Sequence, residues 1–440
     1  MERLGWRDAP RVSLTQWDAL ARFAEAARGE GFTRTVMCGM GGSSLAPEIL
    51  ATSFARPALS VLDSTDPAAV LAVARAPDFD RTLFLIASKS GTTVETLAFY
   101  HYLAARVEPA RFVAITDPGS PLERLARERG FRAVFPHPPD VGGRYAALTV
   151  VGMLPAALIG VDGRALLERA LAVDPAAGRA LGARLAQAAR AGRDKLVLRP
   201  PPPVERLADW VEQIVAESTG KNGRGVVPVV DDPCATPGPD GELVTDFSAD
   251  PGALGAAFVM WAYATWELSE ALGVNAFDQP DVGAAKALAR AELEGRSAAA
   301  PPAAAVPGTL TPEALRRAAR PGDYLALLAY LPPTLEVRAQ LHAVRAAWAR
   351  TLGCATTLGF GPRYLHSTGQ LHKGGPNSGL FLVITCDDPE DADIPEMGIT
   401  FGRLKAAQAR GDVRALVARE RRVAQVHLKS LEDVGGLMPA

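Results

Sequence analysis

The feature that most constrains the fold is a repeated alternation of short apolar runs with helical stretches in the first half of the chain. The apolar runs have the length of buried strands, and the stretches between them carry Ala, Leu and Arg at helical spacing. Such alternation predicts a parallel sheet with helices on both faces. The predicted strands are 35–39, 59–63, 83–87, 111–116 and 132–135, and the predicted helices are 44–54, 93–106 and 120–129.

The same alternation returns in the second half, after a proline-rich elbow at 200–203 and an Ala/Pro connector at 297–308. We therefore predict two α/β domains, 1–190 and 191–440, with similar architecture but no clear sequence repeat. The predicted strands of the second half are 195–200, 324–331, 354–358, 379–385 and 422–428, and the helices are 204–219, 252–272, 334–352 and 402–411.

Composition excludes several classes of function. With 47 basic and 49 acidic residues, the chain has no general basic field for nucleic acid or an anionic membrane, so a phosphate would need a local site. Four cysteines lie far apart without a CxxC pair or a Cys/His cluster, so neither a disulfide framework nor a zinc site is predicted. Charges at the start of the chain, and the absence of any run of ~18 apolar residues, predict a cytoplasmic protein.

A glycine-rich turn at 38–50 joins a strand to a helix. Glycines let the backbone approach a ligand, and the helix start offers N–H groups to an anion. The turn lacks the GK[ST] of a Walker loop, and Ser44 breaks the GxGxxG fingerprint, although Asp63 leaves a dinucleotide interpretation open.

A second turn, 88–93, places four hydroxyls at the start of a helix, with Lys89 beside them. An ordinary helix cap uses only one hydroxyl. The run of Ser88, Ser90, Thr92 and Thr93 therefore favours a phosphate-binding site at the carboxyl edge of the sheet.

Two further segments carry charged residues suited to catalysis. Arg144 follows two glycines and can stabilise an oxyanion, although a lone arginine is usually an exposed, solvated side chain. Gln213 and Glu217 share a face of a helix, so Glu217 can act as a base, although spacing alone favours a surface glutamate.

The last two segments lie in the second half. A loop with Gln279 leads into a helix with Lys286, and a loop-like stretch at 361–379 holds His366 and His372. Proton transfer suits these histidines better than metal binding, because carboxylate or cysteine partners are missing nearby.

Taken together, the motifs resemble those of the glucose-6-phosphate isomerase family, most closely the isomerase half of fused transaldolase–isomerase proteins. The resemblance rests on GMGGSS (39–44), SKSGTTVET (88–96), VGGRY (141–145), QxxxESxGK (213–221) and FDQ with a lysine seven positions after its glutamine (277–286).

The resemblance implies two doubly wound, parallel-sheet α/β domains of the sugar-isomerase (SIS) type, a homodimer, a sugar-phosphate substrate, and no metal or organic cofactor. It implies that Glu217 moves a proton between C2 and C1, that Arg144 stabilises the enediolate, and that Lys286 lies near the ring oxygen. The implied substrate-binding residues are Gly42, Ser43, Ser88, Lys89, Ser90, Thr93, Gln213 and Gln279.

One departure concerns the ring-opening histidine. In most relatives a His with Gln four residues later precedes the FDQ segment, whereas His366 and Gln370 follow it here. We assign ring opening to His366, with His372 as the alternative. The competing functions are a non-catalytic phosphosugar-binding module, which would not need Glu217 or Arg144, and a dinucleotide-dependent oxidoreductase.

Overall fold

The computed structural model describes residues 3–230, 238–293 and 304–439, except the side chains of residues 284–286. Its first sheet contains five parallel strands in the order β2-β1-β3-β4-β5, so the chain starts near the middle and winds outward in both directions. This is a doubly wound sheet, and all five strands predicted for this half are confirmed. The strands are β1 (Arg34–Gly39), β2 (Leu59–Leu62), β3 (Thr82–Ala87), β4 (Phe112–Thr116) and β5 (Ala133–Pro136).

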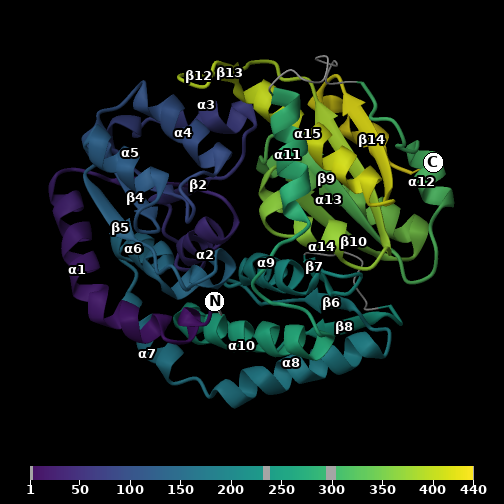
Figure 1. Cartoon of the computed structure of the whole chain (residues 1–440), viewed down its shortest axis with the longest axis horizontal. Helices are drawn as coiled ribbons and strands as arrows, with labels where there is room; N and C mark the ends of the chain where they lie inside the picture. Colours follow the sequence, from purple (N-terminus) through teal and green to yellow (C-terminus); the bar gives the residue numbers. More distant parts are fainter. Residues whose placement is uncertain (1–2, 231–237, 294–303, 440) are drawn as a thin grey trace.

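Helices cover both faces of this sheet (Figure 1). Alternate residues of β3 point to opposite faces, so Leu85 packs against one set of helices and Phe84 against another. The helices of this half are α1 (Ala9–Gly29), α2 (Leu45–Ser53), α3 (Pro67–Ala74), α4 (Val94–Ala104), α5 (Pro121–Arg129), α6 (Val150–Leu158), α7 (Gly163–Leu171) and α8 (Pro175–Arg190).

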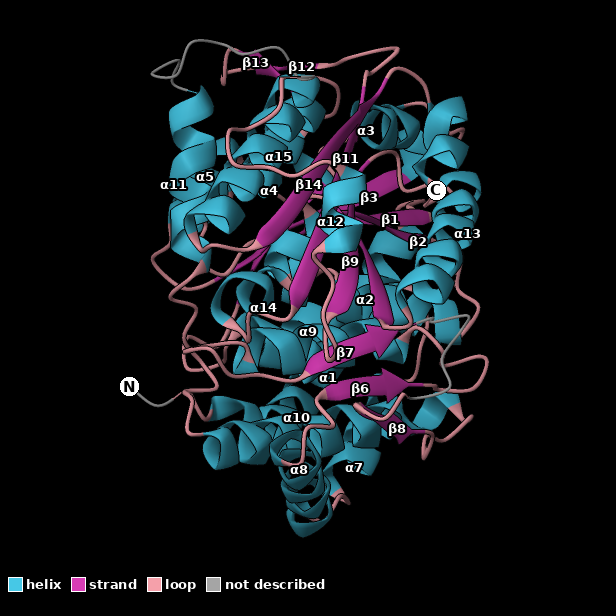
Figure 2. Ribbon diagram, turned by 90° about the vertical axis from the view of Figure 1, so that its right-hand side faces the viewer, coloured by secondary structure: helices cyan, strands magenta, loops and turns pink. Residues whose placement is uncertain are grey.

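A second parallel sheet has the order β10-β9-β11-β14 and lies beside the first unit (Figures 1 and 2). Its strands are β9 (Tyr324–Tyr330), β10 (Ala355–Phe360), β11 (Gly379–Cys386) and β14 (Arg422–Leu428), as predicted. The remaining elements here are α11 (Val282–Leu293), α12 (Pro312–Arg317), α13 (Leu335–Leu352), α14 (Gly369–Gly374), α15 (Phe401–Ala418) and the antiparallel pair β12 (Asp393–Ile394) and β13 (Ile399–Thr400).

Three short parallel strands form a separate sheet, in the order β7-β6-β8, below the second sheet in Figure 2. Only β6 (Lys195–Leu198) was predicted; β7 (Val227–Val230) and β8 (Gly241–Val244) were not. Helix α9 (Leu207–Thr219) lies between β6 and β7 in sequence, and α10 (Leu254–Leu272) follows β8.

Helices α8 and α10 lie side by side although the predicted domain boundary at residue 190 separates them (Figure 1). Gly178 and Gly182 face the backbone of α10, where a Cβ on Gly182 would clash with the carbonyl of Ala264. The boundary stays a prediction, and this helix pair joins its two sides.

Two predictions were wrong in detail. The helix predicted at 402–411 continues to Ala418, and the loop-like stretch 361–379 contains a 3₁₀ helix at Arg363–His366 and the short helix α14. Most of the predicted Ala/Pro connector, 297–303, lies outside the described residues. In the described part of the chain, no helix is both long and apolar enough to span a membrane.

Candidate functional site

Glu217 lies in the last turn of α9 and is buried, with 6% of its surface exposed. The expectation of a surface glutamate from spacing alone was therefore wrong. Its Oε1 is 3.0 Å from Arg144 Nη1 and accepts a hydrogen bond from Gln279, while its Oε2 accepts one of 3.1 Å from Gln213. We call Arg144, Gln213, Glu217 and Gln279 the glutamate cluster.

Arg144 is held from three sides. Its Nε donates to Ser218 Oγ at 2.9 Å, and its Nη2 donates to the carbonyl of Ala276 at 2.7 Å. The residue is 4% exposed, so the interpretation as a solvated arginine was wrong as well. A buried guanidinium needs an anionic partner, and Glu217 supplies it. The charge that could stabilise an oxyanion therefore sits directly against the carboxylate that could move a proton.

Gln213 connects the glutamate cluster to His366. Its Nε2 donates both to Glu217 and, at 2.8 Å, to the backbone carbonyl of His366. Gly41, with φ of +54°, fits against both partners, because a Cβ there would clash with the His366 carbonyl and with Gln213 Nε2. Likewise, a Cβ on Gly42 would clash with the carbonyl of Gly143, so the glycine-rich turn closes on the segment that carries Arg144.

The turn at residues 88–93, which we call the hydroxyl cradle, lies at the carboxyl end of β3, next to the glycine-rich turn that follows β1. Ser88 Oγ lies 2.9 Å from Thr93 Oγ1, and Ser90 Oγ lies 2.9 Å from Thr92 Oγ1. Thr93 is the N-cap of α4 but its side chain makes no capping bond. The helix start therefore keeps N–H groups that can meet an anion.

The other predicted binding residues take different positions. Ser43 is half-buried in the glycine-rich turn, and Gln279 is exposed and bonds to Glu217.

The Lys89 ammonium pairs with Asp117 at 2.7 Å and donates to the Pro139 carbonyl, so its charge is compensated at the cradle. Lys286 lies in α11, but its side chain is outside the described residues.

The two histidines of the 361–379 stretch have different surroundings. His366 Nε2 is 3.0 Å from Glu95 Oε1, and the ring is partly exposed. His372 is 3% exposed and packs against the rings of Tyr364 and Phe381. Burial, together with the neighbouring Lys373, lowers the pKa of His372 well below its usual value. His372 is therefore neutral in the core, and only His366 meets a carboxylate.

Sequence reasoning missed two polar residues around His366. Glu95 lies in the first turn of α4, within the quoted motif SKSGTTVET, so its place next to the cradle could have been noticed. Gln408 lies on α15, more than 300 residues away along the chain, and donates to Glu95 Oε1 at 2.8 Å. No motif marks Gln408.

Lys221, from the loop after α9, holds the segment that carries Gln279. Its ammonium is buried, donates to the carbonyl of Asp278 at 2.7 Å and to its carboxylate at 2.8 Å. Burial and the nearby Arg144 lower the pKa of Lys221 to about 8. Asp63 is also engaged: its Oδ2 accepts from Ser44 and faces Arg363, which accounts for this carboxylate without a ribose.

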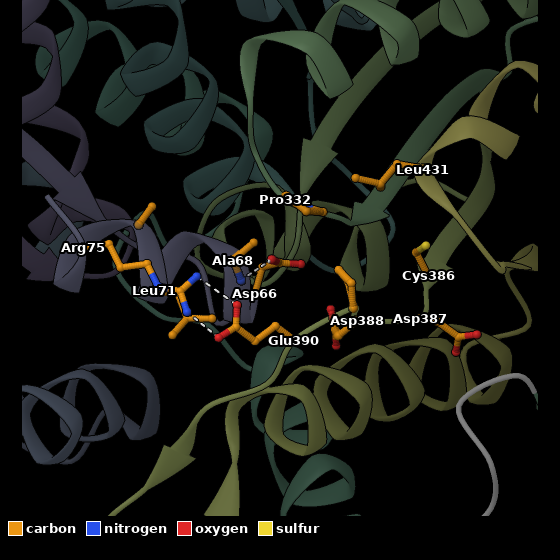
Figure 3. Close-up of a pocket in the computed structure, with 12 residues that line it drawn as sticks. Asp66, Ala68, Leu71, Arg75, Pro332, Cys386, Asp387, Asp388, Glu390 and Leu431 are labelled. Atoms are coloured by element: carbon orange, nitrogen blue, oxygen red, sulfur yellow. Dashed lines mark hydrogen bonds and ion pairs between the residues drawn. The ribbon is translucent and has the colours of Figure 1, made fainter.

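Within the described ranges, no three His, Cys, Asp or Glu side chains are grouped so that they could hold a metal ion. A cavity of about 390 Å³ lies between α3 and the end of β11, lined by Asp66, Cys386 and Asp388 among others (Figure 3). None of the residues of the glutamate cluster or the hydroxyl cradle lines it.

Fold and site together define a doubly wound α/β protein that has a hydroxyl-rich helix start and a buried glutamate–arginine pair. Residues 22–178 match the family model "Phosphoglucose isomerase", and the predicted resemblance to the glucose-6-phosphate isomerases is confirmed. The closeness to fused transaldolase proteins stays a prediction.

Individual relatives that match the chain carry the name glucose-6-phosphate isomerase. A glucose-6-phosphate isomerase of Rubrobacter xylanophilus is 31% identical over 240 residues, which are 48% of this chain and 56% of the relative. One of a Synechococcus strain is 37% identical over 223 residues, 45% of this chain and 41% of the relative. The matches thus span about half the length of these curated relatives.

Among solved structures, a glucose-6-phosphate isomerase of Chlamydia trachomatis superposes with a TM-score of 0.56 at 20% identity. The superposition covers 66% of this chain and 74% of that one. At this identity the likeness concerns the fold.

Proposed function

We propose that this protein interconverts glucose 6-phosphate and fructose 6-phosphate through an enediolate, as a step of glycolysis and gluconeogenesis. The observation that carries the proposal is the glutamate cluster, in which a buried carboxylate is held by an arginine and two amides. Gln213 connects this cluster to the backbone of His366, and the glycine-rich turn lies between the cluster and the hydroxyl cradle. The similarity to named glucose-6-phosphate isomerases supports it.

In the proposed reaction, the phosphate binds at the hydroxyl cradle and meets the N–H groups at the start of α4. Gly42, Ser43 and Lys89 line the same edge of the sheet. Glu217 takes the proton from C2 and returns it to C1. One carboxylate can serve both carbons because they are adjacent. Arg144 stabilises the negative charge of the enediolate, and Gln213 and Gln279 keep the Glu217 carboxylate aimed at the substrate.

Ring opening belongs to His366 in this proposal, with Lys286 near the ring oxygen. An imidazole can protonate the ring oxygen or take the anomeric proton. The Glu95 contact orients the His366 ring, whereas His372 is enclosed by aromatic side chains.

We further propose a homodimer located in the cytoplasm, with a sugar phosphate as its only small-molecule partner. We expect no cofactor, no nucleic acid and no membrane contact, in line with the balanced charge of the chain.

A coupled assay that offers glucose, fructose and mannose 6-phosphates to the purified protein tests the function. We expect interconversion of the first two. A protein that binds these phosphates but turns over none of them would be a binding module instead.

The histidine assignment has its own test. His366→Ala should slow turnover of cyclic glucose 6-phosphate about 10²-fold while sparing proton exchange on an open-chain analogue. His372→Ala should lower the melting temperature but affect the two substrates alike. The reverse pattern would transfer ring opening to His372.

A further inference from the structure

Gln408 lies where the unit of the first sheet (β1 to β5) contacts the unit of the second sheet (β9 to β11 and β14). It is on α15 of the second unit, is 4% exposed, and its side chain bonds to Thr65 and Glu95 of the first unit. Its Nε2 donates to Glu95 Oε1 at 2.8 Å, and its Oε1 accepts from Thr65 Oγ1 at 2.6 Å. The Glu95 carboxylate accepts from the amide nitrogen and so fixes which end of the amide faces it, while the Thr65 hydroxyl donates to the amide oxygen at the other end.

We propose that Gln408, bonded to Thr65, is a positioning residue that holds the Glu95 carboxylate against His366. It thereby fixes the orientation of the His366 imidazole for opening of the sugar ring. The inference rests on the proposed isomerase function and adds a part of the site that no motif indicated.

The reason for this role is the position of the Glu95 carboxylate between Gln408 and His366. Glu95 Oε1 accepts from Gln408 and lies 3.0 Å from His366 Nε2. With Glu95 ionised, its carboxylate can only accept, so in the neutral ring the proton facing it is on Nε2 and Nδ1 is the nitrogen left to accept a proton. Without the Gln408 amide, Glu95 would lose the bond that holds this oxygen in place, and the His366 ring would lose its fixed tautomer and orientation.

Other contacts join the same two units without touching Glu95. One turn before Gln408 on α15, the Lys405 ammonium pairs with Asp66 at 2.8 Å, next to Thr65 and at the wall of the cavity in Figure 3. Arg363, which begins the 3₁₀ helix ending at His366, pairs with Asp63 at 3.1 Å. Residues 63–66 thus tie down both α15 and the His366 segment.

His366 and, from β9, Tyr330 are titratable groups that lie near Glu95. Burial, with added contributions from Asp412 and Glu95, raises the pKa of Tyr330 well above its usual value, so this phenol stays neutral. Tyr330 therefore supplies no competing charge, and the Gln408 amide donates to the same Glu95 oxygen that faces His366.

The test compares two substrates in Gln408→Met, which keeps the length of the side chain and removes its donor. We expect kcat for cyclic glucose 6-phosphate to fall about 10-fold, with KM little changed. Proton exchange on an analogue that cannot cyclise should stay within about 2-fold of the wild type, because Glu217 and Arg144 are untouched. Thr65→Val should give a smaller change in the same direction.

Lys405→Met is the matched control, since it breaks a contact between the same two units without touching Glu95. It should lower the melting temperature but leave the ratio of the two activities unchanged. An equal loss on both substrates in Gln408→Met, or the same ratio change in Lys405→Met, would reduce Gln408 to a structural contact. If Gln408→Met fails to fold, Thr65→Val decides by the same ratio. A wild-type protein that isomerises no sugar phosphate would instead refute the proposed function itself.

Discussion

The glutamate cluster and the hydroxyl cradle both adjoin the glycine-rich turn that follows β1, but they are built in opposite ways. In the cluster, Glu217 and Arg144 are 6% and 4% exposed and compensate each other's charge. In the cradle, Ser90 and Thr92 are exposed, and the hydroxyls bond to one another at a helix start. The cluster brings its own charges, so it must bury them as a pair. The ligand proposed for the cradle brings its own charge, so the hydroxyls of the cradle can stay neutral and partly exposed.

Substrate binding and proton transfer are therefore proposed to depend on different regions of the site. A phosphate keeps its charge throughout the reaction, so contacts from the cradle stabilise the ground state and the transition state alike. The charge that Arg144 is proposed to meet exists only in the enediolate. Substitutions in the two regions should therefore change different kinetic constants.

The largest effect is expected for Glu217→Gln, which keeps the shape of the side chain but removes the base. The value of kcat should fall about 10²-fold or more, as measured in the coupled assay. Circular dichroism would establish that the variant is folded. Near-normal turnover would assign the base to another residue.

Arg144→Ala should follow closely, with a loss in kcat of about 10²-fold and little change in KM. Because it leaves Glu217 as an uncompensated buried charge, the free energy of unfolding should also drop by about 3–5 kcal/mol. Urea titration measures the second quantity. An increase in KM alone would place Arg144 in ground-state binding.

The double variant Ser88→Ala/Thr93→Ala tests the cradle. We expect KM to rise about 10-fold with kcat nearly retained, since these contacts persist through the reaction. Titration with inorganic phosphate, followed by calorimetry, should show weaker binding as well. Unchanged phosphate affinity would locate the phosphate site elsewhere.

The smallest effect is expected from removing metal ions. The proposed mechanism uses Glu217, Arg144 and His366 and assigns no step to a metal. Exhaustive chelation should therefore leave kcat/KM unchanged. Loss of activity that an added divalent ion restores would contradict the mechanism.

The strands of the two large sheets could be predicted because strands of parallel sheets read as continuous apolar runs. The small sheet could not. Pro228 interrupts β7, which argues against a strand, and Glu242 leaves β8 without an apolar pattern. The helix predicted at 402–411 ends on Gly411, but α15 continues through this glycine, which lies where α15 meets α11 and where a Cβ would clash with the backbone of Ala289.

The residues of the site likewise divide into those that local motifs predicted and those that only the folded chain brings together. The turns that carry Ser88 and Arg144 could be found from local motifs, because their spacing along the chain is short. Burial of Glu217 could not, since it depends on Gln279 from a distant loop. Gln408 could not be predicted for the same reason, because its partners Thr65 and Glu95 lie far away in the sequence. A glutamine on an ordinary helix has no distinguishing neighbours in sequence.

The contact of α8 with α10 has a consequence for how the molecule comes apart. Gly178 and Gly182 let the two helices approach so closely that neither surface is suited to water on its own. A cut after residue 190 would separate them, so the order of the chain does not define the cooperative unit of unfolding. Backbone amides of α8 and α10 should show a common free energy of opening in hydrogen exchange, as parts of one opening event that crosses the predicted boundary between domains.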